Sequence, residues 1–413
     1  MDVVSDDLFS AGAVVNPYPV FAHLRVTDPV HWVERDRAWL VTRHDDVVAG
    51  LHDPRFSSNR VVTMSDQAAN PMQGPTNLLS DWMVFKDPPD HTRLRRLVQK
   101  AFSPGVVRTL EPTVQLLVDE QLDRLADAQP PDGYGHGVVD VQQTFASVLP
   151  AVVVAHMLGV PESDRLQFKT WSEELAPMVF FAPGVADRRE RGARALGELG
   201  AYFGELMHAR RVAPTDDLMT ALVEVHDEGM SLTTDELLAT CTLLLFAGHE
   251  TTTALITNGL AALLEAPDQR DVLMADPTLI GSAVEELLRF DGPAKVELRR
   301  AVEPVELRGR MIEPGERMFF ATAAANRDPE VFTQPDQLDI TRTLNQHVGF
   351  GFGIHFCLGA SLARLEAAIA LRSMLERFPD MQLVTSPSLL PWSPVLASRS
   401  LLSLPVHLRP DLG

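Results

Sequence analysis

The sequence predicts a mainly α-helical fold with small β-sheets, and three observations support this prediction. Helical periodicity dominates after about residue 91, short alternating segments follow residue 302, and clusters of Pro and Gly separate these segments. We therefore expect a large helical lobe and a small β-rich lobe. The length of 413 residues leaves open whether the chain forms one large domain or several lobes.

The individual elements follow from the same patterns. Residues 30–34 and 38–42 are apolar runs separated by Arg35-Asp36-Arg37, which predicts a hairpin. Helices are predicted over residues 92–100, 106–128, 139–158, 190–211, 216–228, 232–265 and 360–375. Strands are predicted over residues 305–307, 317–321 and 401–408. Residues 61–80 and 175–185 are interpreted either as mobile covers or as loops that pack on the body.

Composition excludes several classes of protein. The net charge of −20 argues against a nucleic-acid binder. The two cysteines, Cys241 and Cys357, cannot form a disulfide framework or a four-cysteine zinc site, and they favour a reducing, cytoplasmic compartment. The acidic start is unlike a signal peptide. The uncharged stretch 141–161 is interrupted by polar residues and Pro, so it predicts a buried helix and no membrane span.

Residues 350–359 form the most informative segment, Phe-Gly-Phe-Gly-Ile-His-Phe-Cys-Leu-Gly, directly before a predicted helix. Three glycines around one thiol indicate a backbone that approaches something large and flat. A helix that begins just after Cys357 directs its positive end at the sulfur, which favours the thiolate. A lone thiolate suits the axial position of haem iron.

This segment resembles the haem-binding loop of the cytochrome P450 family, F-G-x-G-x-H-x-C-x-G, at every named position. The resemblance extends from Asn16-Pro17-Tyr18-Pro19 to Leu404-Pro405-Val406 and implies one cytochrome P450 domain over residues 1–413. It implies haem b as the cofactor and Cys357 as the proximal iron ligand. Phe350, His355 and Gly359 are implied as further haem-binding residues.

A second motif, residues 247–252 (Ala-Gly-His-Glu-Thr-Thr), lies in the middle of the helix predicted from Leu232. Gly beside an acid and β-branched residues predicts a local widening of the helix, although an exposed polar stretch is an alternative. The motif resembles the oxygen-activation motif of the family. The resemblance implies Glu250 and Thr251 as the catalytic acid and alcohol, and Ala247 and Gly248 as residues next to the haem.

A third motif, Glu286-x-x-Arg289, lies near the end of a helix predicted to begin at Asp276-Pro277. Residues three apart on a helix can pair, but such pairs are common. The family carries this pair as a structural core. Where the family often has an arginine that completes the network, this chain has Gln337, and Arg342 is a candidate substitute.

Basic residues are needed for the two haem propionates. The resemblance implies His91, Arg95, Arg299 and His355, although each alone is also typical of a solvated surface. Three further cations of the same early helix, Arg93, Arg96 and Lys100, suggest a docking face for an acidic electron donor or, as an alternative, a solubilising face.

The resemblance also implies a largely apolar substrate pocket that includes residues 61–83. Its other members are Leu243, Phe246, Ala294, Val296, Glu297, Ala397 and Ser398. Lys295 and Glu297 are unusual there. They either contact polar groups of the substrate or, as we prefer, point outward as a neutral pair.

Together these features predict a soluble, bacterial-type haem-thiolate monooxygenase. It would hydroxylate or epoxidise a small-to-medium hydrophobic substrate, such as a steroid, terpenoid, fatty acid or polyketide, with O2. No flavin or nicotinamide fingerprint occurs, so we expect a ferredoxin and a ferredoxin reductase as electron donors, and a monomeric protein. A peroxide-driven haem-thiolate peroxygenase and a non-catalytic haem-binding sensor are the alternatives.

Overall fold

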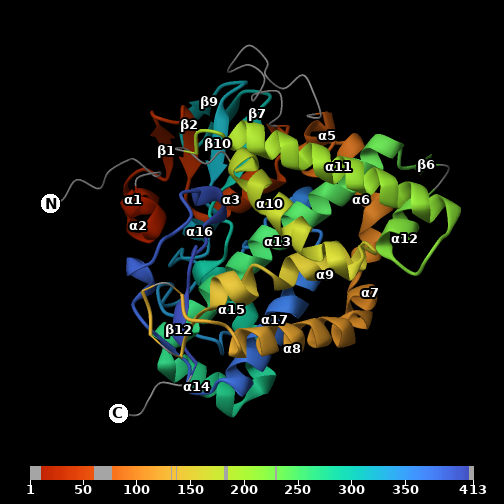
Figure 1. The fold of residues 1–413 in the computed structure, drawn as a ribbon. Helices are drawn as coiled ribbons and strands as arrows, with labels where there is room; N and C mark the ends of the chain where they lie inside the picture. The colour runs from red at the N-terminus through yellow and green to blue at the C-terminus, as the bar shows by residue number, and fades with distance from the viewer. Residues whose placement is uncertain are drawn as a thin grey trace. The chain divides into compact units, whose positions relative to one another are not determined.

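The computed structural model describes residues 11–59, 77–131, 133–135, 137–180, 185–227 and 230–408. It is mostly helical with small sheets, as the sequence predicts (Figure 1). The chain divides into two compact units. Unit 1 comprises residues 1–56, 113–149 and 251–413, and unit 2 comprises residues 57–112 and 150–250.

Unit 1 contains the larger sheets. A five-stranded sheet has the order β1-β2-β10-β7-β3, with β2 parallel to β10 and antiparallel to β1. A three-stranded sheet has the order β11-β12-β4. The strands are β1 (Val30–Val33), β2 (Ala38–Val41), β3 (Phe56–Ser57), β4 (Val138–Asp140), β7 (Glu297–Ala301), β8 (Val305–Leu307), β9 (Arg310–Ile312), β10 (Arg317–Phe320), β11 (Gln382–Leu383) and β12 (Pro405–His407).

The helices of unit 1 pack apolar faces on these sheets and on one another. Phe21 and Leu24 of α2 lie in one buried cluster with Leu40 of β2, because apolar residues three apart share a helix face. The helices are α1 (Ala11–Val15), α2 (Tyr18–Thr27), α3 (His44–His52), α8 (Glu111–Ala126, almost wholly in this unit), α14 (Pro267–Ala275), α15 (Ile280–Asp291), α16 (Thr322–Ala325) and α17 (Ala360–Arg377). Short 3-10 turns include η5 (Pro277–Leu279), η6 (Gly353–His355), η7 (Pro387–Leu389) and η8 (Leu396–Ser398).

Unit 2 is helical apart from the small pair β5 (His226–Asp227) and β6 (Met230–Ser231). Its helices are α5 (Asn77–Ser80), α6 (Asp90–Val98), α7 (Pro104–Thr109), α9 (Leu149–Met157), α10 (Arg165–Val179), α11 (Arg188–Val212) and α12 (Leu218–Glu224). Helices α10 and α11 run side by side (Figure 1). The long helix α13 (Thr234–Glu265) begins in unit 2 and continues into unit 1.

Most predicted elements are present, with four corrections. The helix predicted over 106–128 is divided at Leu110 into α7 and α8, and the strand predicted over 401–408 covers only Pro405–His407. Residues 138–140 form strand β4, followed by a short π-helix, Gln142–Ala146, so the helix predicted over 139–158 is limited to Leu149–Met157. The Asp140 carboxylate accepts the backbone N–H groups of Gln142 and Gln143 and so caps the π-helix that follows the strand. The helix predicted over 216–228 covers only Leu218–Glu224.

The hairpin is confirmed, since β1 and β2 pair antiparallel across residues 34–37. Most of the segment 61–80 lies outside the described residues, as do residues 181–184. Within the described parts of the chain, no helix combines the length and the apolar character that crossing a membrane requires.

Candidate active site

The backbone around Cys357 is shaped by two glycines in the left-handed region. Gly351 has φ +71° and Gly353 has φ +72°. The N–H of Cys357 donates to the carbonyl of Phe350 at 2.9 Å, and the N–H of Phe356 donates to the carbonyl of Gly353 at 3.0 Å. The loop is therefore a tight, hydrogen-bonded turn that requires glycine at both positions.

Close packing adds a second reason for Gly353. A Cβ at this position would lie 2.9 Å from the carbonyl oxygen of Leu51, at the end of α3. Any other residue would push the loop away from α3. This neighbour is protein, so the predicted approach of the loop backbone to something large and flat stays a prediction.

The thiol of Cys357 lies three residues before the 18-residue helix α17, which begins at Ala360. The amide end of this helix is electropositive, and Arg364 of α17 adds a cation. The pKa of Arg364 is raised, first by hydrogen bonds from its guanidinium to Glu285 and also by electrostatic attraction to Cys357. Arg364 lies over the Phe350 ring, 4.5 Å from its centre. These surroundings favour the thiolate.

Apolar side chains of the same loop are exposed. Phe352 is 40%, Ile354 is 50% and Phe356 is 39% accessible to solvent. An anionic sulfur, a helix N-terminus and a glycine-shaped backbone form a donor set that fits the thiolate ligand of a haem iron. The residues present here are therefore compatible with haem.

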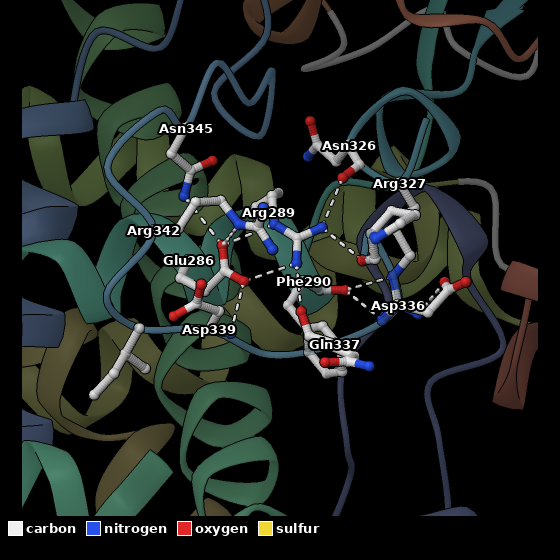
Figure 2. Close-up of polar contacts among 12 residues, drawn as sticks. Glu286, Arg289, Phe290, Asn326, Arg327, Asp336, Gln337, Asp339, Arg342 and Asn345 are labelled. Atoms are coloured by element: carbon white, nitrogen blue, oxygen red, sulfur yellow. Dashed lines mark hydrogen bonds and ion pairs between the residues drawn. The ribbon is translucent and has the colours of Figure 1, made fainter. Parts of the chain in front are cut away.

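Glu286 and Arg289 form a fully buried pair at the end of α15, as Figure 2 shows. The Arg289 guanidinium donates twice to Glu286, at 2.7 Å each. Its remaining donors bind the backbone carbonyls of Asn326, Pro335 and Gln337 at 2.7–3.0 Å. The pair thus holds a segment with little regular structure, residues 326–348, that leads into the Cys357 loop. The predicted role as a structural core agrees with this geometry.

Arg342 completes this network. Its Nε donates to the Glu286 carboxylate at 3.0 Å, beside Asn345 and the backbone N–H of Asp339. Gln337 contributes only its carbonyl oxygen. The suggestion that Arg342 substitutes for the arginine missing at Gln337 is confirmed by these contacts (Figure 2).

The middle of α13 differs from the prediction. Residues 234–265 are one uninterrupted α-helix, so the predicted widening is wrong. Gly248 has another effect. A Cβ there would lie 2.8 Å from the Val154 side chain, so glycine allows α9 to approach α13 closely. A capping box precedes α13, since Thr233 and Glu236 exchange two side chain-to-backbone bonds.

Among the described residues, Glu250 forms no ion pair with a Lys or Arg. Its side chain is 21% exposed, and its Oε1 lies 3.4 Å from Nδ1 of the buried His249. Burial raises the pKa of Glu250 to about 8, with a further rise from Glu173 and a decrease from Lys169. At neutral pH the carboxyl group therefore carries its proton. Thr251 follows directly on the same helix and is half-buried.

The predicted pocket residues of unit 2 lie in an aromatic cluster. Leu243 and Phe246 are buried on α13. The Phe246 ring lies 5.3 Å from Trp82 and 5.2 Å from Phe180. The Trp82 indole N–H donates to Thr242 at 2.9 Å, which fixes the large ring. Ala247 is exposed one residue further along α13.

The predicted pocket residues of unit 1 lie on two segments. Ala294, Val296 and Glu297 lie at the start of β7, whereas Ala397 and Ser398 belong to η8. Val296 is part of a buried apolar cluster, and Ala397 packs against the same cluster.

Lys295 corrects the prediction of an outward-pointing pair. Its side chain is 0% exposed, and its Nζ donates to Asp291 at 2.5 Å and to the Tyr18 hydroxyl at 2.8 Å. Glu297 instead lies 3.5 Å from Arg299. The physical reason is that Asp291 lies four residues before Lys295 and offers a partly buried carboxylate.

The cations of α6 have separate surroundings. His91 is buried, whereas Arg95 and Arg96 are half-buried and Lys100 is exposed. Arg93 forms an ion pair with Glu236, so its part in the predicted docking face is corrected: its charge is already neutralised within unit 2. In unit 1, Arg299 is buried and donates to the carbonyl of Leu298 at 2.8 Å, and His355 ends η6.

Sequence reasoning missed two groups. Glu285 accepts two bonds from Arg364 and lies 3.1 Å from His347, which connects α15, α17 and the segment before the loop. The adjacent carboxyls at 285 and 286 were a usable signal, because they face different partners. In the cluster around Asp291, the i,i+4 spacing of Asp291 and Lys295 was a local signal, whereas Tyr18 and Arg399 lie far away in the sequence.

Comparisons with known proteins agree with this geometry. The family model described as Cytochrome P450 matches residues 72–387. The chain is 42% identical over 399 residues to the Cytochrome P450 monooxygenase PikC of Streptomyces venezuelae, covering 95% of this chain and 91% of that protein. It is 41% identical to the Vitamin D(3) 25-hydroxylase of Pseudonocardia autotrophica, covering 98% and 96%. Among solved structures, the bacillaene polyketide synthase cytochrome P450 PksS of Bacillus subtilis 168 matches with a TM-score of 0.86 and 37% identity, covering 96% and 97%.

Proposed function

The chain belongs to the cytochrome P450 family, a family of haem-thiolate monooxygenases, and we propose that it inserts one oxygen atom of O2 into a hydrophobic substrate with electrons from separate proteins. The observation that carries this proposal is the Cys357 thiol on a glycine-shaped turn before α17. Haem b is the proposed form of the cofactor, with Cys357 as its proximal ligand. When bound, it supplies an iron that activates dioxygen, and thiolate ligation favours O–O cleavage.

The proposed haem partners are of two kinds. Phe350 and Gly359 flank the thiol on the loop, and Ala247 and Gly248 are small residues on α13. The propionate partners are His91, Arg95, Arg299 and His355. Cationic or hydrogen-bonding groups are required there because a buried carboxylate without a partner is costly.

Glu250 and Thr251 are proposed to manage protons. A carboxyl group with a pKa of about 8 retains its proton at pH 7 and can release it to a basic neighbour. The Thr251 hydroxyl can accept a proton and pass on its own. An acid and an alcohol at adjacent positions therefore support the use of O2, which needs two protons, and not the use of peroxide.

A small-to-medium lipophilic substrate is proposed, such as a steroid, terpenoid, fatty acid or polyketide. Leu243, Phe246 and Val296 are buried apolar residues, so burial of apolar surface would supply most of the binding free energy. Lys295 is turned into the protein, which removes a charge from this wall. Two similar proteins, a vitamin D(3) 25-hydroxylase and a polyketide synthase P450, are named for substrates or products of this kind.

Electrons are proposed to come from a ferredoxin and its reductase. Arg96 and Lys100 are proposed as the cationic docking face; Arg93 pairs with Glu236 within unit 2. Charge reversal of Arg96 and Lys100 to Glu should slow reduction by an acidic ferredoxin.

The CO spectrum of the reduced protein tests the proposal. We expect the red-shifted band that is specific for thiolate ligation in the wild type, and its loss in Cys357→Ala. Cys241→Ala is the matched control, because Cys241 is a fully buried thiol on α13. A wild type without the band, or a Cys357→Ala variant that keeps it, would contradict the proposal.

The peroxide alternative has its own test. Thr251→Ala should leave peroxide-driven turnover intact while it lowers the yield of product per reductant with O2. Equal losses with both oxidants would contradict the role of Thr251 in proton management.

A further inference from the structure

Asp291 is the centre of a buried ionic cluster outside the sites described above. Its Oδ1 accepts from the Tyr18 hydroxyl at 2.6 Å, from Lys295 at 2.5 Å and from Arg399 at 2.7 Å, and its Oδ2 accepts from Arg399 at 2.7 Å. The Lys295 side chain is fully buried, and that of Arg399 is 5% exposed. One carboxylate therefore binds two buried cations from distant parts of the chain.

The two cations belong to the two segments of unit 1 that carry the proposed substrate wall. Lys295 lies between Ala294 and Val296, and Arg399 directly follows Ser398. The backbones are joined as well, because the N–H of Arg399 donates to the carbonyl of Pro293 at 3.0 Å. The Asp291 carboxylate thus determines how far apart these two segments can lie.

Further contacts hold both segments against the rest of unit 1. The carbonyl of Ala294 accepts from Thr322 at 2.9 Å, and that of Lys295 accepts from the N–H of Ala323 at 3.2 Å. Arg399 donates to the carbonyls of Val14 and Val15 at 2.9 and 2.6 Å. The cluster is therefore anchored on three sides, and Lys295 is its one lysine.

We propose that Lys295 is a positioning residue: through Asp291 and Arg399, it fixes the spacing of segments 293–297 and 397–399 and thereby the apolar fit of the substrate. This inference rests on the proposed function. Lys295 would not touch the reacting atoms. A hydrophobic residue of similar length would fill the same space without binding the Asp291 carboxylate.

The charge balance of the cluster makes this role dependent on pH. The groups that face Lys295 are Asp291, Tyr18, Arg399 and Arg327, which together give one anion and two further cations. Burial lowers the pKa of Lys295 to about 7, with contributions from Arg399 and Arg327, against the opposing effect of Asp291. Above pH 7 the ammonium becomes a neutral amine, and its hold on the Asp291 carboxylate weakens.

Pyridine and 4-phenylpyridine, added to the ferric holoenzyme, distinguish binding to the haem iron from contact with the proposed substrate wall. Both bind haem iron through nitrogen, whereas only the phenyl ring needs an apolar wall. The measured quantity is the ratio of their dissociation constants, read from the spectral shift between pH 6 and pH 9. In the wild type, we expect the preference for 4-phenylpyridine to decrease as the pH rises through about 7.

Variants of Lys295 test whether this residue causes the change with pH in the preference for 4-phenylpyridine. Lys295→Met should lower the preference at pH 6 by about tenfold and make it independent of pH. Lys295→Arg, which keeps the charge at every pH in this range, should keep the high preference throughout. Lys86→Met is the control, because it removes a partly exposed ion pair with Asp81 in unit 2.

The outcomes are distinct. If Lys295→Met keeps the wild-type preference at pH 6, the positioning role is wrong. If Lys295→Met fails to bind haem, the wild-type pH profile decides: a transition near pH 7 supports the role and a flat profile contradicts it. If pyridine causes no spectral shift in the wild type, the haem site itself fails, and with it this inference.

Discussion

Two buried ionic clusters lie at the end of α15 and differ in the kinds of cation that bind their carboxylates. In the first, the Glu286 carboxylate accepts from Arg289, Arg342, Asn345 and the N–H of Asp339. Arg289 uses all five of its N–H donors. In the second, the carboxylate of Asp291 is shared by Lys295 and Arg399, with Arg327 over the Tyr18 ring nearby.

The difference separates a rigid scaffold from an adjustable one. In the Glu286 cluster, the carboxylate and all five N–H donors of Arg289 are hydrogen-bonded, which favours one arrangement of residues 326–348. In the Asp291 cluster, one of the two cations on the carboxylate is a lysine, and burial lowers the pKa of Lys295. Lys295 can therefore lose its charge near neutral pH, which makes the second cluster the adjustable one.

The largest expected effect is on the first cluster. Glu286→Gln keeps the shape of the side chain but leaves the buried Arg289 charge without its anion. We expect a loss of about 3–5 kcal/mol in unfolding free energy, measured by urea denaturation of the holoenzyme. Arg377→Gln is the control, because its pair with Asp123 is largely exposed and should cost under about 1 kcal/mol. A Glu286→Gln variant as stable as this control would contradict the scaffold interpretation.

Glu250 extends the comparison to a partly exposed acid that forms no ion pair with a Lys or Arg among the described residues. Because burial raises its pKa to about 8, the carboxyl group holds a proton below that pH and loses it above. We expect O2-dependent product formation to decrease about tenfold for each pH unit above 8. Glu250→Gln should form product slowly at all pH values and should not show the decrease above pH 8. A wild-type profile without a decrease above pH 8 would contradict a proton-donating role.

Lys295 should also change the pH dependence of stability. The folded pKa of about 7 is lower than the ordinary value of 10.5, so between these values the unfolded chain binds more protons. Stability contributed by this group therefore increases from pH 7 towards 10.5, by at most about 1.4 kcal/mol per pH unit. The difference in urea midpoint between wild type and Lys295→Met should show this slope. The apolar preference of the substrate wall should decrease over the same range, so stability and fit move in opposite directions.

Local motifs were predictable, and long-range clusters were not. The Cys357 loop and the Glu286–Arg289 pair depend on residues close in sequence, so the spacing of these residues predicts their geometry. The surroundings of Lys295 depend on Tyr18 and Arg399, which the sequence places far from it. The i,i+4 spacing of Asp291 and Lys295 allows a local pair, but the sequence does not show that Tyr18 and Arg399 enclose this pair. The outward orientation predicted for Lys295 therefore failed.

The uninterrupted helix α13 teaches a similar point. Glycine with β-branched neighbours lowers helix propensity, but tertiary packing can override this propensity when a close contact stabilises the helix. The contact between Gly248 and Val154 is of this kind. Propensity correctly marked the position as unusual, whereas the tertiary contact determined its conformation.

The smallest expected effect concerns Arg342, which adds one charged hydrogen bond to the Glu286 cluster from a partly exposed position. Arg342→Gln should lower the unfolding free energy by about 1 kcal/mol, because Arg289 still neutralises the Glu286 carboxylate. Gln337→Ala is the matched control: only its backbone carbonyl binds Arg289, and its exposed side chain should be dispensable. If Gln337→Ala costs as much as Arg342→Gln, the network is completed at position 337 and not at 342. A much larger loss of unfolding free energy in Arg342→Gln would instead mean that the buried Glu286 carboxylate needs both guanidinium groups. Arg289 alone would then be insufficient to stabilise the first cluster.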